Sequence, residues 1–347
     1  MASFFCATEN PRVGIGEMNM IEMHHICKTF RVAQRNAGFG EAVRALFRKD
    51  YTLVHALQDV SFTIGDGEIV GYIGPNGAGK SSTIKVMSGI LTPDSGQCVI
   101  DGLVPWKSRK EHVSRIGVVF GQRSQLWWDV PVIDSFELIR DIYRVEPEAY
   151  RRQLDELTEL LDLGEILRTP ARQLSLGQRM RCEIAGSLLH SPRLLFLDEP
   201  TIGLDAVSKR AVREFIRRIN REKKTTVILT THDMQDIEAL AQRILLIGKG
   251  RILLDGTLEQ LKKRHGGQKR LAVDYGEKGP DETVSLPAGL SAAGKAEGRQ
   301  LYEVDTALLS VSEAMAALSQ LGEVRDLTVT EPTAEELVVS LYREFHL

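Results

Sequence analysis

The stretch Gly74-Pro75-Asn76-Gly77-Ala78-Gly79-Lys80-Ser81 has the pattern G-x-x-x-x-G-K-[ST] and lies between the apolar run 69–73 and a segment from Ser82 that favours a helix. Strand, loop and helix in this order are the context of a phosphate-binding loop. Glycines allow the tight turn that directs successive N–H groups at one anion, and the helix adds its positive N-terminal end. The sequence therefore predicts that residues 74–82 bind phosphates, with Lys80 at the β and γ phosphates and Ser81 on Mg²⁺.

The composition is that of a soluble globular protein, with 43% hydrophobic and 26% charged residues. A length of 347 residues leaves room for two domains. The net charge of −3 does not indicate nucleic acid as a partner. No apolar run approaches the roughly 18 residues that span a bilayer, so we expect any associated pore to belong to another chain. Four cysteines without C-x-x-C spacing favour reduced thiols over disulfides or a zinc site: Cys6, Cys27, Cys98 and Cys182.

Hydrophobic patterning divides the chain into four parts. Residues 1–19 have neither a basic n-region nor a sustained apolar h-region, so we expect a disordered leader, with Met18 or Met20 as a possible start. Residues 20–265 alternate apolar strands with helices, which predicts an α/β domain around a mostly parallel sheet. Within it, residues 122–190 are mainly helical in pattern. After a composition change near residue 265, residues 268–347 favour a small α+β domain.

Residues 31–50 interrupt the strand pattern of the α/β domain. Phe39, Val43, Leu46 and Phe47 share one face of a predicted short helix, and five basic against two acidic residues give 5 − 2 = +3. Such a helix can lie on an anionic lipid surface or dock a partner. The alternative is a solvated excursion that packs on its own domain.

Polar residues follow the carboxyl ends of several predicted strands, where ligands of parallel sheets collect. Gln122 follows one apolar run, Asp198 and Glu199 end another, and His232 follows a third. Asp198 is suited to hold Mg²⁺ through water, and Glu199 to polarise an attacking water. Ser175 opens a helix whose N–H groups present a second anion site, although a simple N-cap explains the same serine.

The order of these motifs resembles that of the ATP-binding subunit of ABC transporters. The resemblance covers residues 21–264 and rests on the phosphate loop, Gln122, the signature Ser175-Leu176-Gly177-Gln178, Asp198-Glu199, Gly203-Leu204-Asp205 and His232. It implies a P-loop ATPase core with an antiparallel β subdomain and a helical signature subdomain. ATP and Mg²⁺ are the implied cofactors.

The family resemblance also implies roles for individual residues. Its members close head to tail, so the signature residues 175–178 would contact the γ-phosphate bound by a homodimer partner or a close paralogue. Leu176 departs from the usual glycine. Gln122 would sense Mg²⁺ and water, His232 would hold the γ-phosphate and position Glu199, and Asp205 would belong to a dimer-interface loop. An aromatic residue stacks on adenine in the family, which indicates Phe30 or Tyr51.

The segment Leu126-Trp127-Trp128 follows Gln122, in a region that receives the membrane subunit in the family. Its tryptophans either dock that subunit or fill the core of the helical subdomain. The stretches Glu68-Ile69-Val70-Gly71 and Gly203-Leu204-Asp205 and the C-terminal domain resemble the ABC-2-type exporter ATPases, which include multidrug and daunorubicin-type members. This resemblance implies a position at the cytoplasmic face of the inner membrane, peripheral to a separately encoded permease. The alternatives are a soluble ABC ATPase that acts on nucleic acid or the ribosome, and a subunit that binds ATP without hydrolysis.

Overall fold

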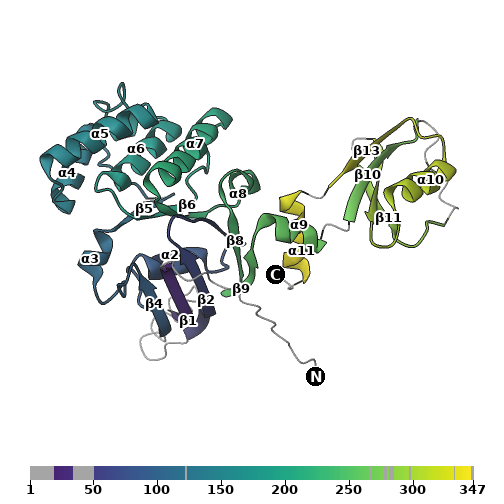
Figure 1. The fold of residues 1–347 in the computed structure, drawn as a ribbon, viewed down its shortest axis with the longest axis horizontal. Helices are drawn as coiled ribbons and strands as arrows, with labels where there is room; N and C mark the ends of the chain where they lie inside the picture. The colour runs from purple at the N-terminus through teal and green to yellow at the C-terminus, as the bar shows by residue number, and fades with distance from the viewer. Residues whose placement is uncertain are drawn as a thin grey trace, which may run out of the picture. The chain divides into compact units, whose positions relative to one another are not determined.

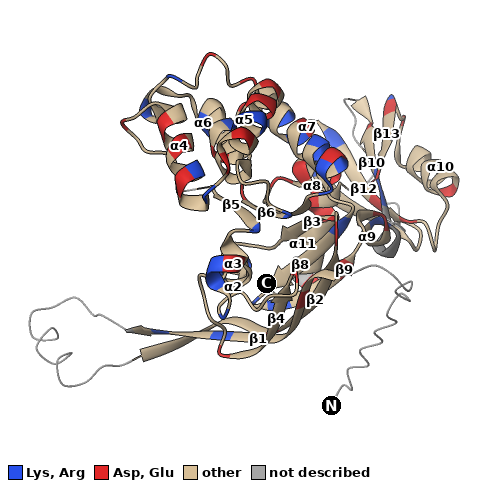
Figure 2. Ribbon diagram, turned by 60° about the vertical axis from the view of Figure 1, so that its left-hand side comes forward, with Lys and Arg blue, Asp and Glu red and all other residues tan. Residues whose placement is uncertain are grey.

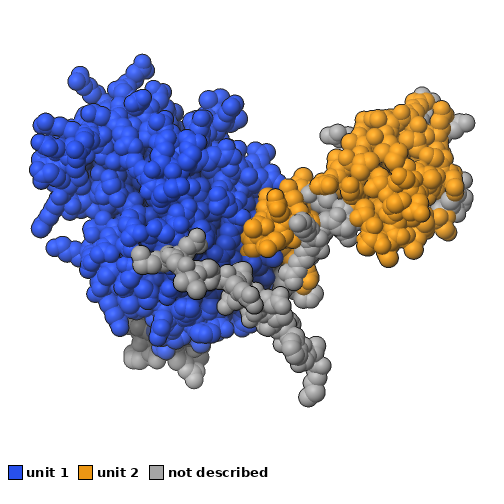
Figure 3. All heavy atoms as spheres, viewed as in Figure 1, with its two compact units in different colours: residues 1–255 blue, residues 256–347 orange. Residues whose placement is uncertain are grey.

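The computed structural model describes residues 19–33, 51–121, 123–265, 268–276, 280, 285–296, 298–331 and 333–344. Contacts divide the chain into two compact units, Met1–Asp255 and Gly256–Leu347 (Figure 3). The division falls before the composition change near residue 265, because helix α9 (Leu258–His265) packs against the last helix, α11 (Ala334–Glu344). The expected leader lies outside the described residues, apart from Asn19.

A six-stranded sheet is the centre of unit 1 (Figure 1). Its strand order is β5-β6-β7-β3-β8-β9, and the pairs β5–β6, β6–β7, β7–β3 and β3–β8 are parallel. The strands are β3 (Ile69–Ile73), β5 (Ile116–Phe120), β6 (Leu194–Asp198), β7 (Thr226–Thr230), β8 (Arg243–Gly248) and β9 (Arg251–Gly256). Because β3, β6 and β7 are buried on both faces, they are continuous apolar runs, as the sequence predicts.

Unit 1 also contains the helices that pack around this sheet and a group of helices that lie together. They are α2 (Lys80–Met87), α3 (Arg109–Val113), α4 (Val132–Tyr143), α5 (Pro147–Leu161), the short η1 (Ala171–Gln173), α6 (Leu176–Leu188), α7 (Ala206–Lys223) and α8 (Met234–Leu240). Helices α4, α5 and α6 lie together, away from β1, β2 and β4 (Figures 1 and 2). They occupy most of the helical segment expected over residues 122–190. Among the described residues, no helix has the length and apolar character that crossing a bilayer requires.

A second sheet of unit 1 is antiparallel, in the order β2-β1-β4. It contains β1 (Asn19–Ala33), β2 (Tyr51–Gly65) and β4 (Ser95–Ile100), and its buried face shares a core with the central sheet through residues such as Met23, Phe62 and Tyr72. The interruption expected from Arg31 was placed too early, since β1 stays paired with β2 as far as Ala33 opposite Tyr51. The expected helix over residues 39–47 lies outside the described residues.

Unit 2 contains a four-stranded antiparallel sheet in the order β11-β12-β10-β13. Its elements are β10 (Gln268–Asp274), β11 (Leu290–Ala296), β12 (Arg299–Asp305), α10 (Val311–Leu321), β13 (Asp326–Thr330) and α11. Leu271, Tyr302 and Val304 pack with Leu318 of α10 in a core of their own. The unit is α+β, as the sequence predicts, although β11 was not expected.

Candidate nucleotide site

The loop after β3 is shaped by glycines at three points. A Cβ at Gly74 would lie 2.4 Å from the Ile247 carbonyl oxygen, and one at Gly79 would lie 2.7 Å from that of Ala56. Gly79 also has a φ of 116°, which disfavours side chains. A Cβ at Gly77, by contrast, would meet no atom within 4 Å. The loop is therefore pressed against β2 and β8 on one side and open at Gly77 on the other.

Lys80 is buried at the start of α2 and bonds to its own loop. Its Nζ donates to the carbonyl oxygens of Gly74 and Pro75, so the ammonium lies under the open turn. Burial lowers the pKa of Lys80, and the nearby carboxylates of Glu199 and Asp198 oppose that shift. Loop, lysine and the two carboxylates thus belong to one electrostatic site.

The carboxylates are held by the end of the neighbouring strand. Asp198 and Thr230 are partners in the β6–β7 register, and the Thr230 hydroxyl donates to Asp198 Oδ1 over 2.5 Å. The Glu199 N–H donates to the Thr230 carbonyl oxygen at 2.9 Å, and Glu199 adopts a left-handed φ of 55°. Its Oε2 lies 2.9 Å from Nδ1 of His232. The structure therefore brings together Lys80, Asp198, Glu199 and His232, which are far apart in the sequence.

Asp236 holds the His232 segment in place and was missed by sequence reasoning. This fully buried carboxylate accepts from the hydroxyls of Thr231 and Thr201 and from Nε of Arg213. Thr201 follows Glu199 by two residues, and Thr231 precedes His232. One buried carboxylate thus fixes the chain on both sides of the Glu199–His232 contact. Asp236 lies on the short helix α8, four residues after His232. That spacing matches no distinctive sequence motif, so the sequence alone does not indicate its role.

The segment around Gln122 is tied to the same strand end. Gln122 itself lies outside the described residues. The preceding Gly121 donates its N–H to the Asp198 carbonyl oxygen at 2.8 Å, and a Cβ there would lie 2.7 Å from that oxygen. Because a side chain has no room, glycine is required for the segment to begin next to Asp198.

Glu183 of α6 fixes the residues that follow, and the sequence analysis did not single it out. Its carboxylate accepts from the Ser124 hydroxyl and from the Gln125 N–H, and Nε2 of Gln125 donates to the Glu183 carbonyl oxygen at 2.7 Å. Burial raises the pKa of Glu183, and these donors oppose the shift. The loop of residues 124–128 is therefore bound to the helix that begins at the signature.

The three predicted coupling residues differ in exposure. Trp127 and Trp128 are 59% and 52% exposed, so the alternative that they fill a core is wrong. Leu126 is 5% exposed and is one of the buried core residues. The coupling surface expected at residues 126–128 is thereby reduced to the two tryptophans. Arg179 of α6 lies 5.7 Å from the Trp128 ring, a cation–π contact.

The signature caps α6 and contacts the start of α7. The Gln178 N–H donates to Oγ of Ser175 and the Ser175 N–H donates to the Gln178 side chain, which is a capping box. Gly177 is buried, and a Cβ there would lie 2.5 Å from Oγ of Ser208. Leu176 is 39% exposed and lies against Gly203. Asp205 caps α7, since its carboxylate accepts from the N–H and the hydroxyl of Ser208, which lowers its pKa.

Comparisons with known proteins agree on one family. A family model described as ABC transporter matches residues 57–202. NatA of Bacillus subtilis, an ABC transporter ATP-binding protein, is 32% identical over 215 residues, or 62% of this chain and 87% of NatA. DrrA3 of Streptomyces coeruleorubidus, a daunorubicin resistance ATP-binding protein, is 32% identical over 296 residues, or 84% of this chain and 93% of DrrA3. The chain belongs to the ABC transporter ATP-binding proteins.

Solved structures confirm the fold of an ABC ATPase. A dimeric ATP-binding cassette in a post-hydrolysis state with ADP and Pi matches with a TM-score of 0.57 and 25% identity over 69% of this chain and 98% of that one. An ATP-binding subunit of an ABC transporter matches with a TM-score of 0.59 and 24% identity over 71% and 93% of the two chains. The predicted fold class and family are thus both confirmed.

The residues present fit the Mg-ATP that an ABC ATPase binds. The loop is open at Gly77, where an added Cβ would meet no atom within 4 Å, and the Lys80 ammonium donates to the Gly74 carbonyl oxygen of the same loop. Ser81 is exposed beside Lys80, and Asp198 adds a half-buried carboxylate at the end of β6. An amide-lined loop, an ammonium, a hydroxyl and a carboxylate are the donor set for phosphates and Mg²⁺.

Phe30 and Tyr51 are the two candidates for stacking on adenine in this ABC protein. Ala56 lies against the phosphate loop at Gly79. Phe30 pairs with Val54, two residues from Ala56, whereas Tyr51 lies five residues away along β2. At about 3.3 Å per residue, Tyr51 is roughly 10 Å farther out. The register therefore favours Phe30.

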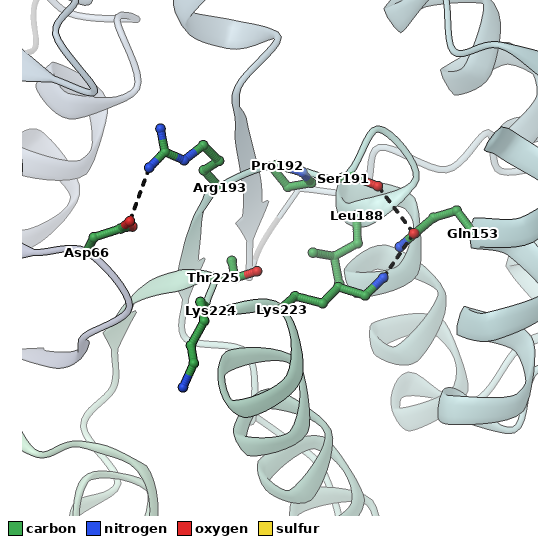
Figure 4. Close-up of a pocket in the computed structure, with 9 residues that line it drawn as sticks. All are labelled: Asp66, Gln153, Leu188, Ser191, Pro192, Arg193, Lys223, Lys224 and Thr225. Atoms are coloured by element: carbon green, nitrogen blue, oxygen red, sulfur yellow. Dashed lines mark hydrogen bonds and ion pairs between the residues drawn. The ribbon is translucent and has the colours of Figure 1, made fainter.

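A pocket of about 240 Å³ lies at the opposite end of the central sheet (Figure 4). Arg193 and Thr225 in its wall precede β6 and β7, so it faces away from Asp198 and His232. Its polar groups are paired with each other: Arg193 bonds to Asp66, and Gln153 bonds to Ser191 and Lys223. This pocket is separate from the nucleotide site of the ABC fold.

Proposed function

We propose that the protein is the ATP-hydrolysing subunit of an ABC exporter. In this proposal, two copies, or one copy and a close paralogue, close around two Mg-ATP and drive a separately encoded membrane subunit at the cytoplasmic face of the membrane. The daunorubicin resistance named for DrrA3 supports the export direction. The solved dimeric cassette with ADP and Pi supports the dimer.

The contact between Glu199 and His232 carries the assignment of hydrolysis. A carboxylate at the end of β6 that is free to accept a proton, with an imidazole 2.9 Å away, is the arrangement that activates water. Nδ1 of His232 contacts Glu199, and in this proposal Nε2 of the same ring contacts a phosphate oxygen. Thr230 and Asp236 keep both residues in position.

Each remaining group has one task in the proposed reaction. Lys80 exchanges its bonds with Gly74 and Pro75 for phosphate oxygens. When bound, Mg²⁺ would neutralise charge on the β and γ phosphates, held by Ser81 and, through water, by Asp198. Gln122, which lies outside the described residues, is assigned by the family resemblance to sense Mg²⁺ and water. The partner's Ser175, Gly177 and Gln178 close the site from the other side.

The test of this proposal is Glu199→Gln in the full chain. The amide keeps the size of the side chain and its contact with His232 but cannot accept the proton from water. We expect ATP to bind, turnover to fall by about 10²-fold or more, and an ATP-dependent dimer to accumulate in size-exclusion chromatography. Glu214→Gln, at an exposed position of α7, is the matched control and should behave like the unaltered protein. Unchanged turnover in Glu199→Gln would refute the assigned base.

A further inference from the structure

The outer part of the β1–β2 hairpin is a two-stranded ribbon. Strand β4 pairs with β1 only as far as Cys27, whereas β1 and β2 stay paired to Ala33 and Tyr51. Residues 28–33 and 51–57 therefore have no third strand, and we call them the ribbon. Figure 2 shows these two strands extending away from the rest of unit 1. An isolated two-stranded hairpin is only marginally stable in water.

Both faces of the ribbon carry exposed apolar side chains. Because cross-strand partners share a face, Phe30 and Val54 lie on one face together with Val32. Leu53 and Tyr51 lie on the other. Their exposed fractions run from 36% at Phe30 to 54% at Leu53. A hairpin in water normally turns one polar face to solvent. In this ribbon the face with Leu53 and Tyr51 also carries Thr29, Arg31 and His55, so polar and apolar side chains are mixed there.

Exposed apolar side chains on both faces of the ribbon indicate what covers it. A protein partner that docks on one face leaves the other face in water. The headgroup region of a bilayer surrounds a projecting ribbon on every side. No third strand of the described ranges pairs with either edge of the ribbon. Because hydrocarbon cannot satisfy the backbone groups of a strand edge, the fitting depth is the interface, where water and headgroups remain available. Tyr51 suits that depth.

The charge of the ribbon selects the type of lipid. Lys28 and Arg31 are its charged residues, and Lys28 already pairs with Asp94 at 2.8 Å. Arg31 is exposed and makes no ion pair within the described part of the chain. By sequence, residues 34–50 add four basic against two acidic residues. A basic segment with apolar and aromatic residues is attracted to anionic headgroups.

We propose that the ribbon inserts at headgroup depth into an anionic membrane surface, independently of any membrane subunit. The contact consists of Val32, Val54 and Leu53 among the lipids, with Arg31 at the phosphates. It does not depend on the proposed ATPase mechanism, since none of these residues belongs to the nucleotide site. Its effect is to fix the orientation of unit 1 at the membrane.

The experiment is co-sedimentation of the purified full chain with vesicles, without a membrane subunit. One set contains roughly one third phosphatidylglycerol in phosphatidylcholine, and the other is phosphatidylcholine alone. We expect binding to the anionic vesicles, weakened by salt, and a loss of at least about tenfold in the double variant Val32→Ser and Leu53→Ser. Arg31→Gln should weaken binding to the anionic vesicles only. ATP binding, measured in parallel, should be unchanged in all variants.

The matched control is the double variant Ile142→Ser and Leu308→Ser, which removes two apolar side chains that are 65% and 69% exposed elsewhere. It should bind vesicles like the unaltered protein. Equal losses in both double variants, or vesicle binding that Val32→Ser and Leu53→Ser leave intact, would overturn the proposal. Absence of vesicle binding would also overturn the proposal. Hydrogen exchange would then show whether a membrane subunit or a second copy of the chain protects the ribbon instead.

Discussion

Phe30 and Tyr51 lie on the same pair of strands, at different distances from the phosphate loop. Phe30 is the nearer by register, so we predict that Phe30→Ala weakens ATP binding by about tenfold through the loss of one stacking contact. Tyr51→Ala should leave ATP affinity within about twofold, because its side chain lies too far out. Titration with a fluorescent ATP analogue measures both. The opposite ranking would assign adenine stacking to Tyr51.

Some residues of the nucleotide site can be recognised from a local sequence motif, and others cannot. Lys80 and Glu199 follow from short patterns, because the turn and the strand end need those residue types at fixed spacing. Asp236, Thr230 and Glu183 act on groups that lie 5 to 59 residues away in sequence. Only the packed fold brings such pairs together, so no spacing rule reveals them.

At the scale of elements, α6 joins the signature to the loop of residues 124–128 through Glu183. Burial raises its pKa in the folded protein, so the folded state holds this proton more tightly than the unfolded chain. The free energy of unfolding should therefore fall as the pH rises from the ordinary glutamate range through the raised value. In Glu183→Gln this part of the pH dependence should be absent.

Urea unfolding at a series of pH values measures this effect. The matched control is Glu214→Gln, whose exposed side chain should leave the pH dependence of the unaltered protein in place. Parallel curves for the unaltered protein and Glu183→Gln would show that Glu183 is not the group responsible.

Secondary structure was predictable where burial imposes a pattern of apolar residues, and the prediction failed where it does not. The buried strands β3, β6 and β7 were found because each is a continuous apolar run. Strand β11 has the sequence LSAAGKA, and only its first residue is buried. Its pairing with β12 supplies the stability that its own residues do not indicate.

At the scale of the whole molecule, the proposal requires an exposed surface that receives a membrane subunit. We predict that Trp127→Ala with Trp128→Ala abolishes transport in reconstituted vesicles while ATP binding is retained. Both rings are more than half exposed, so their removal leaves no core cavity. Loss of the Arg179–Trp128 contact should lower stability by at most about 1 kcal/mol.

Leu126→Ala is the contrasting control for the tryptophan pair. Its side chain is buried, so its loss should cost about 2–5 kcal/mol of stability. Thermal unfolding and a transport assay distinguish the two cases. Global unfolding of the tryptophan variant, or transport at the normal rate, would contradict the docking role.

The capping box of α6 has a consequence for how a closed dimer would come apart. Ser175 and Gln178, which the proposed dimer presents to a neighbour's triphosphate, already satisfy each other in the single chain. Engaging the neighbour means exchanging those bonds for new ones, and a cap of this kind is worth about 1 kcal/mol. Once the terminal phosphate is cleaved, the helix end recovers its own partners without help from solvent. Separation after each cycle is thereby favoured from within the helix itself.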